Sequence, residues 1–306
     1  LTKEHNMDLK SDQIVIANEF GKATFSPFAG ASLRSLKVIS TDGNTYELLT
    51  GGEGPHDPFN LEQGTGNFMM CPWPGRLKKG ILYSDGEKYQ MPINRPPFAI
   101  HGLTRDEKWT VVNVDNERVQ MCTDLKDPWP GKGRVTFNAR LSGSSLIMSL
   151  EIVNYGDNRF PVAIGWHPWF NSSLGDKRLT LSLPGQVSEW KADPDGNANG
   201  FEEQISADLD LRQGMIPGEG VFDHCFRIDP LKPIEIEWEE AIKLTIKSSS
   251  EMDHLVVYSP RESVCVEPLS CTIDAFRLES EGINDTGSRY LDPGCSFYGS
   301  TSWSWI

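Results

Sequence analysis

The chain has 306 residues and a mass of 34.2 kDa, with 43 acidic against 29 basic side chains and a net charge of −14. This balance argues against binding to nucleic acid or to an anionic membrane surface, since both require clustered Lys and Arg. No apolar run approaches the ~20 residues of a membrane span, and the first residues lack the apolar region of a secretory signal. The six cysteines show no CxxC spacing, so we expect neither a zinc ribbon nor a disulfide scaffold, but a reduced cytoplasmic protein.

Apolar residues recur at every second position through most of the chain. In chain order, the strand-like segments are 13–18, 32–39, 119–123, 134–141, 145–154, 178–183, 234–239, 242–247, 254–259, 263–267 and 296–306. Such alternation is typical of half-buried antiparallel strands, and no amphipathic helix longer than about three turns appears. The pattern predicts an all-β protein, a large antiparallel β-sandwich with few short helices, formed as a single domain over residues 1–306.

Two segments lack a strand pattern. Residues 51–76 are rich in Gly and Pro, and an irregular segment of that length is usually functional or contains a missed element. Residues 193–200 resemble a calcium-binding loop, but Ala198 and Gln204 stand where an EF-hand needs Gly and Glu. We therefore expect a Gly/Asn-rich surface loop there, and no metal site.

Three clusters carry candidate chemistry: CPWPGR at 71–76 followed by AIHGL at 99–103, IGWHPWF at 164–170, and VCVEP at 264–268. In the last two, His167 and Glu267 each end an apolar run and precede a proline. Because proline cannot continue a central ladder, we predict that both strands stop there. The two titratable groups would then lie at strand ends, at the mouth of a pocket.

Together these blocks resemble a known family. PWPGRLKKGILYSDGEKYQMPIN with AIHGL, then GWHPWF, VFDHCF and VCVEPLSCTIDAF, are similar to the aldose 1-epimerases, the galactose mutarotase family. The blocks follow the family's order and span residues 72–276. The resemblance implies the family fold, a galactose mutarotase-like supersandwich, which agrees with the strand pattern.

The resemblance also implies roles for individual residues. Glu267 corresponds to the general base, His167 to the general acid, and His101 to a second histidine near the sugar ring oxygen. Arg76 and Asp223 correspond to groups that bind sugar hydroxyls. The family usually has Asn before that arginine, whereas Gly75 stands here, so the loop could hold Arg76 differently. The arginine motif of the branch acting on hexose 6-phosphates is not found.

The implied activity is interconversion of the α and β anomers of a free hexose such as glucose or galactose, by a monomer or homodimer without metal or cofactor. Opening the ring removes a proton from the C1 hydroxyl and gives one to the ring oxygen, which a carboxylate and an imidazolium on opposite sides of the bond can perform. We therefore expect Glu267 ionised and His167 protonated.

Two further sets of side chains are considered beside these residues. Trp73, Trp166 and Trp169 are candidates to stack on the sugar, although we expect at least one to pack in the core. For Arg34, Arg95 and Arg105 we expect that at least two are surface residues.

Four alternatives remain open at this level. The chain could be a non-catalytic sugar sensor on the same fold, or a hexose-6-phosphate 1-epimerase. It could be a metal enzyme with His101, His167 and Glu267 as ligands. It could be a retaining glycosidase, if the carboxyl groups of Glu267 and Asp223 lie ~5–5.5 Å apart.

Overall fold

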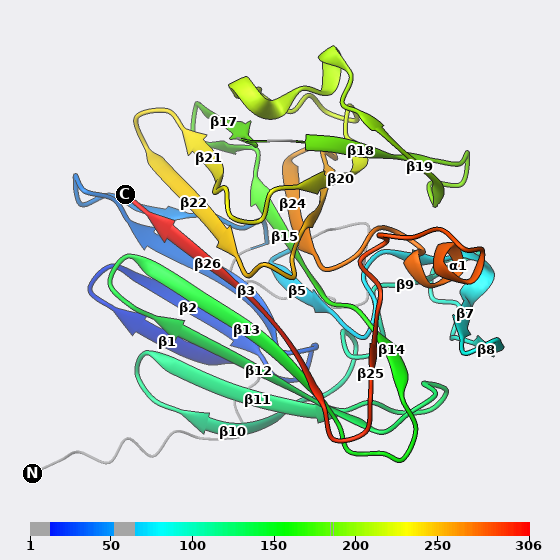
Figure 1. Ribbon diagram of the computed structural model, residues 1–306. Coiled ribbons are helices and arrows are strands. Elements are labelled where there is room, and N and C mark those ends of the chain that lie inside the picture. The colour runs from blue at the N-terminus through cyan, green and yellow to red at the C-terminus, as the bar shows by residue number, and fades with distance from the viewer. Residues whose placement is uncertain (1–12, 52–64, 184, 186) are drawn as a thin grey trace, which may run out of the picture.

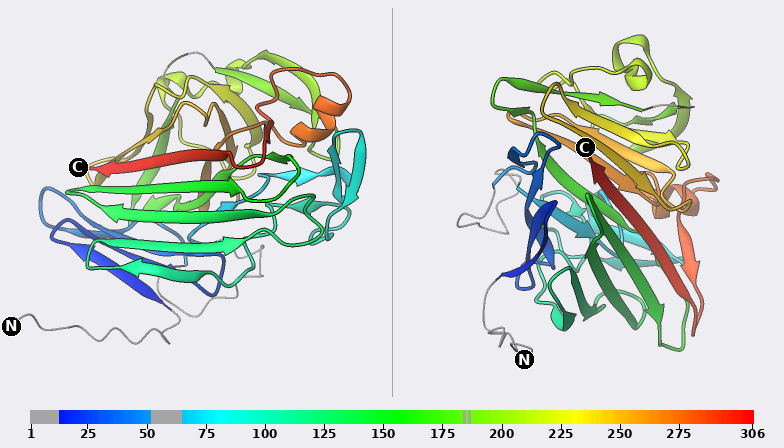
Figure 2. Two further views of the ribbon diagram at one scale, coloured as in Figure 1. Left: turned by 60° about the horizontal axis from the view of Figure 1, so that its bottom comes forward. Right: turned by 90° about the vertical axis from the view of Figure 1, so that its left-hand side faces the viewer.

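Strands dominate the computed structural model, which describes residues 13–51, 65–183, 185 and 187–306. Two large antiparallel sheets pack face to face, as Figures 1 and 2 show, and both contribute to one apolar core. The rings of Phe25 and Phe137 meet between the sheets with centroids 5.7 Å apart. The prediction of a large antiparallel all-β fold is confirmed.

The first sheet carries the residues of interest. From edge to edge its strands are β1 (Ile14–Asn18), β2 (Gly21–Ser26), β3 (Ser32–Ile39), β5 (Asn67–Met70), β15 (Gly165–Asn171), β24 (Ser263–Leu269), β23 (His254–Tyr258), β20 (Asp223–Ile228), β18 (Val187–Ala192) and β19 (Ala198–Gln204), with β4 (Thr45–Glu47) beside β3.

The second sheet closes the other side of the core. Its strands are β10 (Thr110–Val114), β11 (Arg118–Asp124), β12 (Gly133–Leu141), β13 (Ser145–Asn154), β26 (Ser296–Trp305), β22 (Ile242–Ser248), β21 (Ile234–Trp238), β17 (Lys177–Ser182) and β16 (Ser173–Leu174).

Smaller elements complete the described chain. Three short two-stranded sheets are β14 (Phe160–Val162) with β25 (Arg289–Leu291), β6 (Arg76–Leu77) with β9 (Ala99–Ile100), and β7 (Ile81–Ser84) with β8 (Glu87–Gln90). The helices are α1 (Ala275–Ser280) and the 3₁₀ turns η2 (Lys78–Gly80), η3 (Ala207–Leu209) and η4 (Leu211–Gln213). No described helix is long and apolar enough to cross a membrane.

Alternation along the central strands sorts side chains between two faces. Trp166, Val266 and Val257 belong to the core shared with the second sheet. Because successive side chains of a strand point to opposite faces, His167 and Glu267 stand on the other face of the first sheet. That face is therefore where the candidate site forms.

Residues 51–76 contain an element that the pattern missed, the strand β5, which was one of the two alternatives for this segment; residues 52–64 lie outside the described residues. The prediction that two strands stop at His167 and Glu267 is wrong, because β15 and β24 continue through Pro168 and Pro268. The pairing of β15 with β24 lapses between Gly165–Leu269 and Trp169–Cys265, so Pro168 interrupts no bond there, and β15 stays paired with β5.

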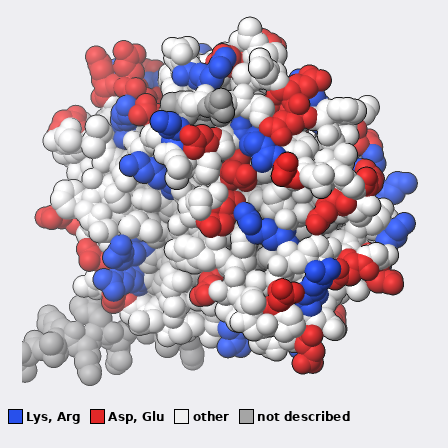
Figure 3. All heavy atoms as spheres, in the orientation of Figure 1, with Lys and Arg blue, Asp and Glu red and all other residues white. Residues whose placement is uncertain are grey.

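Acidic and basic side chains are mixed on the face of the molecule seen in Figure 3. On the Glu-rich strand β21, the apolar side chains Ile234, Ile236 and Trp238 are buried, while Glu235 and Glu237 lie on the other face. The charged side chains of this strand therefore lie on its more exposed face.

The turn that carries His101 depends on Gly102, and this gives a test of the fold. Gly102 has φ 78°, and a Cβ there would lie 2.0 Å from the carbonyl oxygen of Cys71. Gly102→Ala should lower the free energy of unfolding by about 3 kcal/mol, from backbone strain and overpacking together. The measurement is urea denaturation.

Gly86→Ala is the matched control. Gly86 also has a positive φ, 82°, but a Cβ there meets nothing within 4 Å. It should cost only about 1 kcal/mol, the strain of a left-handed alanine. Equal losses in the two variants would contradict the close approach to Cys71.

Candidate active site

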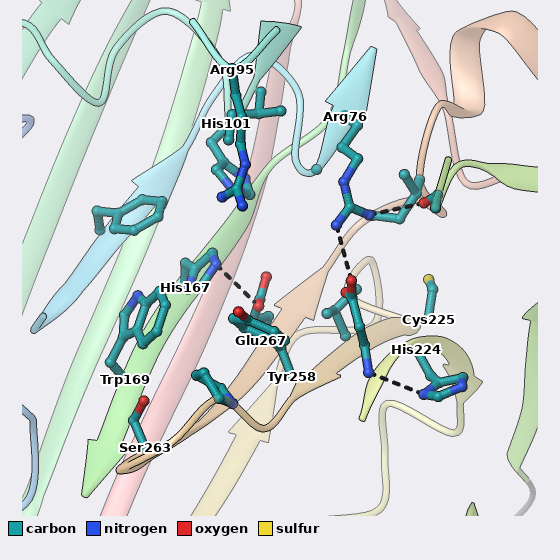
Figure 4. Close-up of a pocket in the computed structure, with 18 of the residues that line it drawn as sticks. Arg76, Arg95, His101, His167, Trp169, His224, Cys225, Tyr258, Ser263 and Glu267 are labelled. Carbon is teal, nitrogen blue, oxygen red and sulfur yellow. Dashed lines mark hydrogen bonds and ion pairs between the residues drawn. The ribbon is translucent and has the colours of Figure 1, made fainter. Parts of the chain in front are cut away.

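A cavity of about 970 Å³ lies on the outer face of the first sheet. Its wall includes side chains from five adjacent strands, β5, β15, β24, β23 and β20, and from the loops that carry Arg76 and His101. Figure 4 shows these groups converging from the sheet and from the loops above it. Segments separated by up to about 200 residues in sequence thus meet in one pocket.

The strand registers arrange the floor of this pocket in two rows. His167 pairs with Phe68, and Glu267 pairs with Val256, which pairs with Cys225. The register of β15 with β24, given by Gly165–Leu269 and Trp169–Cys265, places His167 opposite Glu267. Cross-strand partners share a face, so all five side chains form the first row.

The second row lies two residues along each strand. Trp169 pairs with Cys265, Cys265 with Tyr258, and Tyr258 with Asp223. The rings of Trp169 and Tyr258 meet edge to face with centroids 5.8 Å apart. Because they flank Cys265 on one face, they enclose its thiol, which is fully buried.

His167 and Glu267 form the central contact of the site. Nε2 of His167 lies 3.2 Å from Oε1 of Glu267, and both side chains are about 95% buried. Burial raises the pKa of the Glu267 carboxyl well above its ordinary value; the charge of Asp223 adds to this and Arg76 opposes it. Burial likewise lowers the pKa of His167 to about 3. The substrate-free pair therefore favours its uncharged forms, contrary to the expected carboxylate and imidazolium.

Aromatic rings hold the imidazole of His167 in place. Phe68 stacks on one side with a centroid distance of 4.6 Å, and Trp169 stacks at 5.2 Å, inclined by 14°. Nδ1 of His167 is buried without a hydrogen-bond partner. The ring is thus oriented by packing, and the contact with Glu267 is made by Nε2.

His101 approaches the same pair from the loop side. Its ring stands perpendicular to that of His167, with centroids 5.0 Å apart. Burial, reinforced by His167 and nearby arginines, lowers the pKa of His101 well below its ordinary value. Its φ of 63° is uncommon for a residue with a side chain, and its backbone N–H donates to the carbonyl of Gly75. Strain of this kind gathers where a side chain must be aimed.

Arg76 and Asp223 pair at the cavity mouth. Nη2 of Arg76 lies 3.1 Å from Oδ2 of Asp223, and its Nη1 donates to the carbonyl of Gly196. Gly75, which precedes Arg76, has φ 63°, a conformation open to Asn as well as Gly, but a Cβ there would lie 2.3 Å from Cδ1 of Ile273. Glycine at this position therefore matches the close packing of Ile273 against the loop.

The structure sorts the candidate tryptophans and arginines. Trp73 and Trp166 are core residues, and Trp169 lines the cavity. The expectation that at least two of the three arginines are surface residues is wrong. Arg34 and Arg105 are about 95% buried, whereas Arg95 is exposed and lines the cavity.

The calcium-like loop is held by the protein itself. Asp193 accepts hydrogen bonds from the backbone of Asp195 and Asn197 and pairs with Lys78 at 2.7 Å. Its carboxylate is thus already used, in agreement with a surface turn. Among the described residues, the ligand-like cluster in the cavity consists of His167, Cys265 and Glu267. Cys265, rather than the His101 of the metal-enzyme alternative, lies with His167 and Glu267.

Several of the residues that form the pocket were not identified from the sequence. Phe68 lies in the missed strand β5, and Tyr258 and Cys265 belong to predicted strands without a chemical signal of their own. Their roles follow from strand register alone, which one sequence does not specify.

Comparisons with known proteins give relatives of this chain. The chain is 26% identical to the galactose mutarotase of Homo sapiens over 68% of this chain and 57% of that protein. It is also 26% identical to the uncharacterized protein YihR of Escherichia coli (strain K12), over 72% of this chain and 75% of that protein.

Solved structures share the fold. A galactose mutarotase-like protein from Clostridium acetobutylicum superposes with a TM-score of 0.82 at 20% identity, covering 96% of this chain and 95% of the other. Galactose 1-epimerase from Lactobacillus acidophilus NCFM gives 0.76 at 19%, covering 96% and 94%. A family model described as aldose 1-epimerase matches residues 12–301, and the chain therefore belongs to the aldose 1-epimerase family.

Proposed function

We propose that this protein is an aldose 1-epimerase that interconverts the α and β anomers of a free hexose such as glucose or galactose. The observation that carries the proposal is the buried contact of 3.2 Å between His167 and Glu267 in a cavity of about 970 Å³, which has room for a hexose. An acid and a base in contact suit a reaction that removes one proton from the sugar and adds another proton to it. Both large sheets contribute to one core, which supports a single catalytic domain.

The proton count of the pair fits ring opening. In its ionised form, Glu267 takes the proton of the C1 hydroxyl while protonated His167 gives its proton to the ring oxygen. The pair then holds a neutral carboxylic acid and a neutral imidazole, and the sugar is an open aldehyde. Rotation about the C1–C2 bond and the reverse transfers close the other anomer. O1 and O5 share one carbon, so neighbouring groups can serve both, and they need not lie on opposite sides.

The burial of His167 and Glu267 also bears on the proposed reaction. The uncharged pair that burial favours in the empty site is the form the pair takes when the sugar is open. Both forms carry one proton in total, so they interconvert by transfer across the His167–Glu267 contact. Hydroxyls of a bound sugar would favour the ionised form through hydrogen bonds to the carboxylate.

The remaining groups bind the sugar in this proposal. His101 faces the ring oxygen beside His167, and Arg76 with Asp223 receives hydroxyls at the mouth. Trp169 offers an apolar wall for the sugar face. No cofactor is needed for the proton transfers. We also propose a monomer or homodimer and a cytoplasmic location, the latter supported by six free thiols.

Glu267→Gln tests the base. The amide keeps the shape of the side chain but cannot accept the C1 proton, so kcat should fall by roughly 10²–10⁴. Because the variant removes a carboxyl whose ionised form is disfavoured by burial, the free energy of unfolding should not fall. Polarimetry of fresh α-glucose and α-galactose, corrected for the uncatalysed rate, gives the result.

Glu281→Gln makes the same chemical change outside the cavity, at an exposed partner of Arg277. It should keep the wild-type kcat. If Glu267→Gln retained more than half of the wild-type kcat, its role as base would be wrong.

The pH profile follows from the shifted pKa values. The His167–Glu267 pair is active when it holds one proton in total. Below the lowered pKa of His167, about 3, the pair takes up a second proton and no base remains. Above the raised pKa of Glu267 the proton is lost and no acid remains. With the ordinary pKa values of 4.5 for Glu267 and 6.5 for His167, kcat/KM would be highest only between those two pH values. With the shifted pKa values, the plateau of kcat/KM should extend below pH 4.5 and above pH 6.5.

The measurement is kcat/KM against pH, with circular dichroism to show that the protein stays folded at each pH. Limbs at the two ordinary values would show instead that the free site holds a carboxylate and an imidazolium.

Substrate charge gives a further test. Arg95 is exposed, and an exposed ion pair contributes only about 0–1 kcal/mol, whereas a phosphate site needs several convergent donors. The net charge of −14 also disfavours anions. We expect a higher kcat/KM for glucose than for glucose 6-phosphate at matched ionic strength.

A tenfold preference for the phosphate, about 1.4 kcal/mol of transition-state binding, would favour a hexose-6-phosphate 1-epimerase. Arg95→Ala would then show whether this arginine supplies the preference, since it lines the cavity beside His101 (Figure 4).

A further inference from the structure

Cys265 has no part in the proposed proton transfers, yet it lies against both groups that do. One ligand atom each from His167, Cys265 and Glu267 fall within 4.8 Å of one another. All three residues are at least 95% buried. The register explains the cluster, since Cys265 and Glu267 lie on one face of β24 and His167 stands opposite on β15.

These three donors form a recognisable ligand set. Imidazole nitrogen, thiolate sulfur and carboxylate oxygen all bind Zn²⁺, at about 2.0–2.3 Å from the metal. Tetrahedral ligands at those bond lengths lie roughly 3.3–3.7 Å apart. The His167–Glu267 contact of 3.2 Å already has this spacing, and the longest separation in the cluster needs to close by about 1 Å.

An ion can reach this point from the cavity. His167 and Glu267 line the cavity, whereas Cys265 is enclosed by the rings of Trp169 and Tyr258. The open side therefore leaves a fourth position for water, as in zinc sites with three protein ligands. Phe68 and Trp169 hold the imidazole so that Nε2 faces the cluster.

We propose that His167, Cys265 and Glu267 form an inhibitory site for a thiophilic divalent cation such as Zn²⁺. Binding joins the metal to Nε2, Sγ and a carboxylate oxygen and releases two protons, one from the thiol and one from the carboxylic acid. No electron is transferred. The bound ion occupies both the lone pair of His167 and the carboxylate of Glu267, so neither can exchange a proton with a sugar.

The inhibitory consequence rests on the proposed epimerase function, but binding of the metal does not. The first measurement is therefore made without sugar. Co²⁺ is added to the chelator-treated wild-type protein, and the absorption spectrum is followed for a thiolate-to-cobalt charge-transfer band. We expect this band at one Co²⁺ per chain and its displacement by Zn²⁺. Its absence would overturn the proposal without bearing on the epimerase activity.

Comparison of Cys265→Ser with Cys225→Ser tests whether the thiol of Cys265, and not that of Cys225, binds the metal. Cys225 lines the same pocket, but its sulfur lies 3.6 Å from Oγ1 of Thr272 and it does not belong to the cluster. Cys265→Ser should lose the band and bind Zn²⁺ at least tenfold more weakly by calorimetry, whereas Cys225→Ser should keep both. Equal Zn²⁺ affinity in Cys265→Ser and the wild type would overturn the assignment; Cys265→Ala is the second variant if the serine protein does not fold.

Inhibition is then measured by polarimetry, with each variant normalised to its own basal rate. Zn²⁺ should inhibit the wild type competitively with glucose, and a chelator should restore the full rate. Cys265→Ser should need at least tenfold more Zn²⁺ for half inhibition. Undiminished inhibition of Cys265→Ser would contradict the site, while a rate lost on chelation alone would instead contradict the metal-free mechanism.

Discussion

The contact between His167 and Glu267 is the constraint on which the site depends. A carboxyl and an imidazole are both about 95% buried and meet at 3.2 Å, with aromatic rings stacked on the imidazole. Low polarity around them disfavours charge on either group, so one proton shared between them is the stable arrangement. The fold has to supply this dry surface and hold both groups on it.

The two-sheet architecture meets that requirement. One face of the first sheet packs on the second sheet, and the other face carries the rows of pocket residues under loops with Arg76 and His101. The central strands β15 and β24 are therefore buried on both faces. Polar groups on such strands cost stability unless they are paired. The gap in the pairing of β15 with β24 beside Pro168 lies where His167 and Glu267 face each other.

The same burial that suits proton transfer also suits a soft metal. The second row of the floor brings a thiol beside the acid and the base, enclosed by Trp169 and Tyr258. In the proposed mechanism the ligand atoms of the metal are the proton-carrying atoms of the reaction. Catalysis and metal inhibition are then alternative uses of one cluster, and a sugar and an ion compete for it.

The sequence by itself determined the fold class, since period-two alternation predicted strands such as 32–39 and 145–154. These are β3 in the first sheet and β13 in the second, at their observed bounds. The resemblance of its motifs also indicated the family and the candidate residues. Tertiary structure decided the rest. Strand register, which one sequence leaves open, placed Cys265 beside Glu267 and Phe68 beside His167. Burial set the charge state of the pair, because the pKa of a side chain depends on the neighbours that folding brings to it.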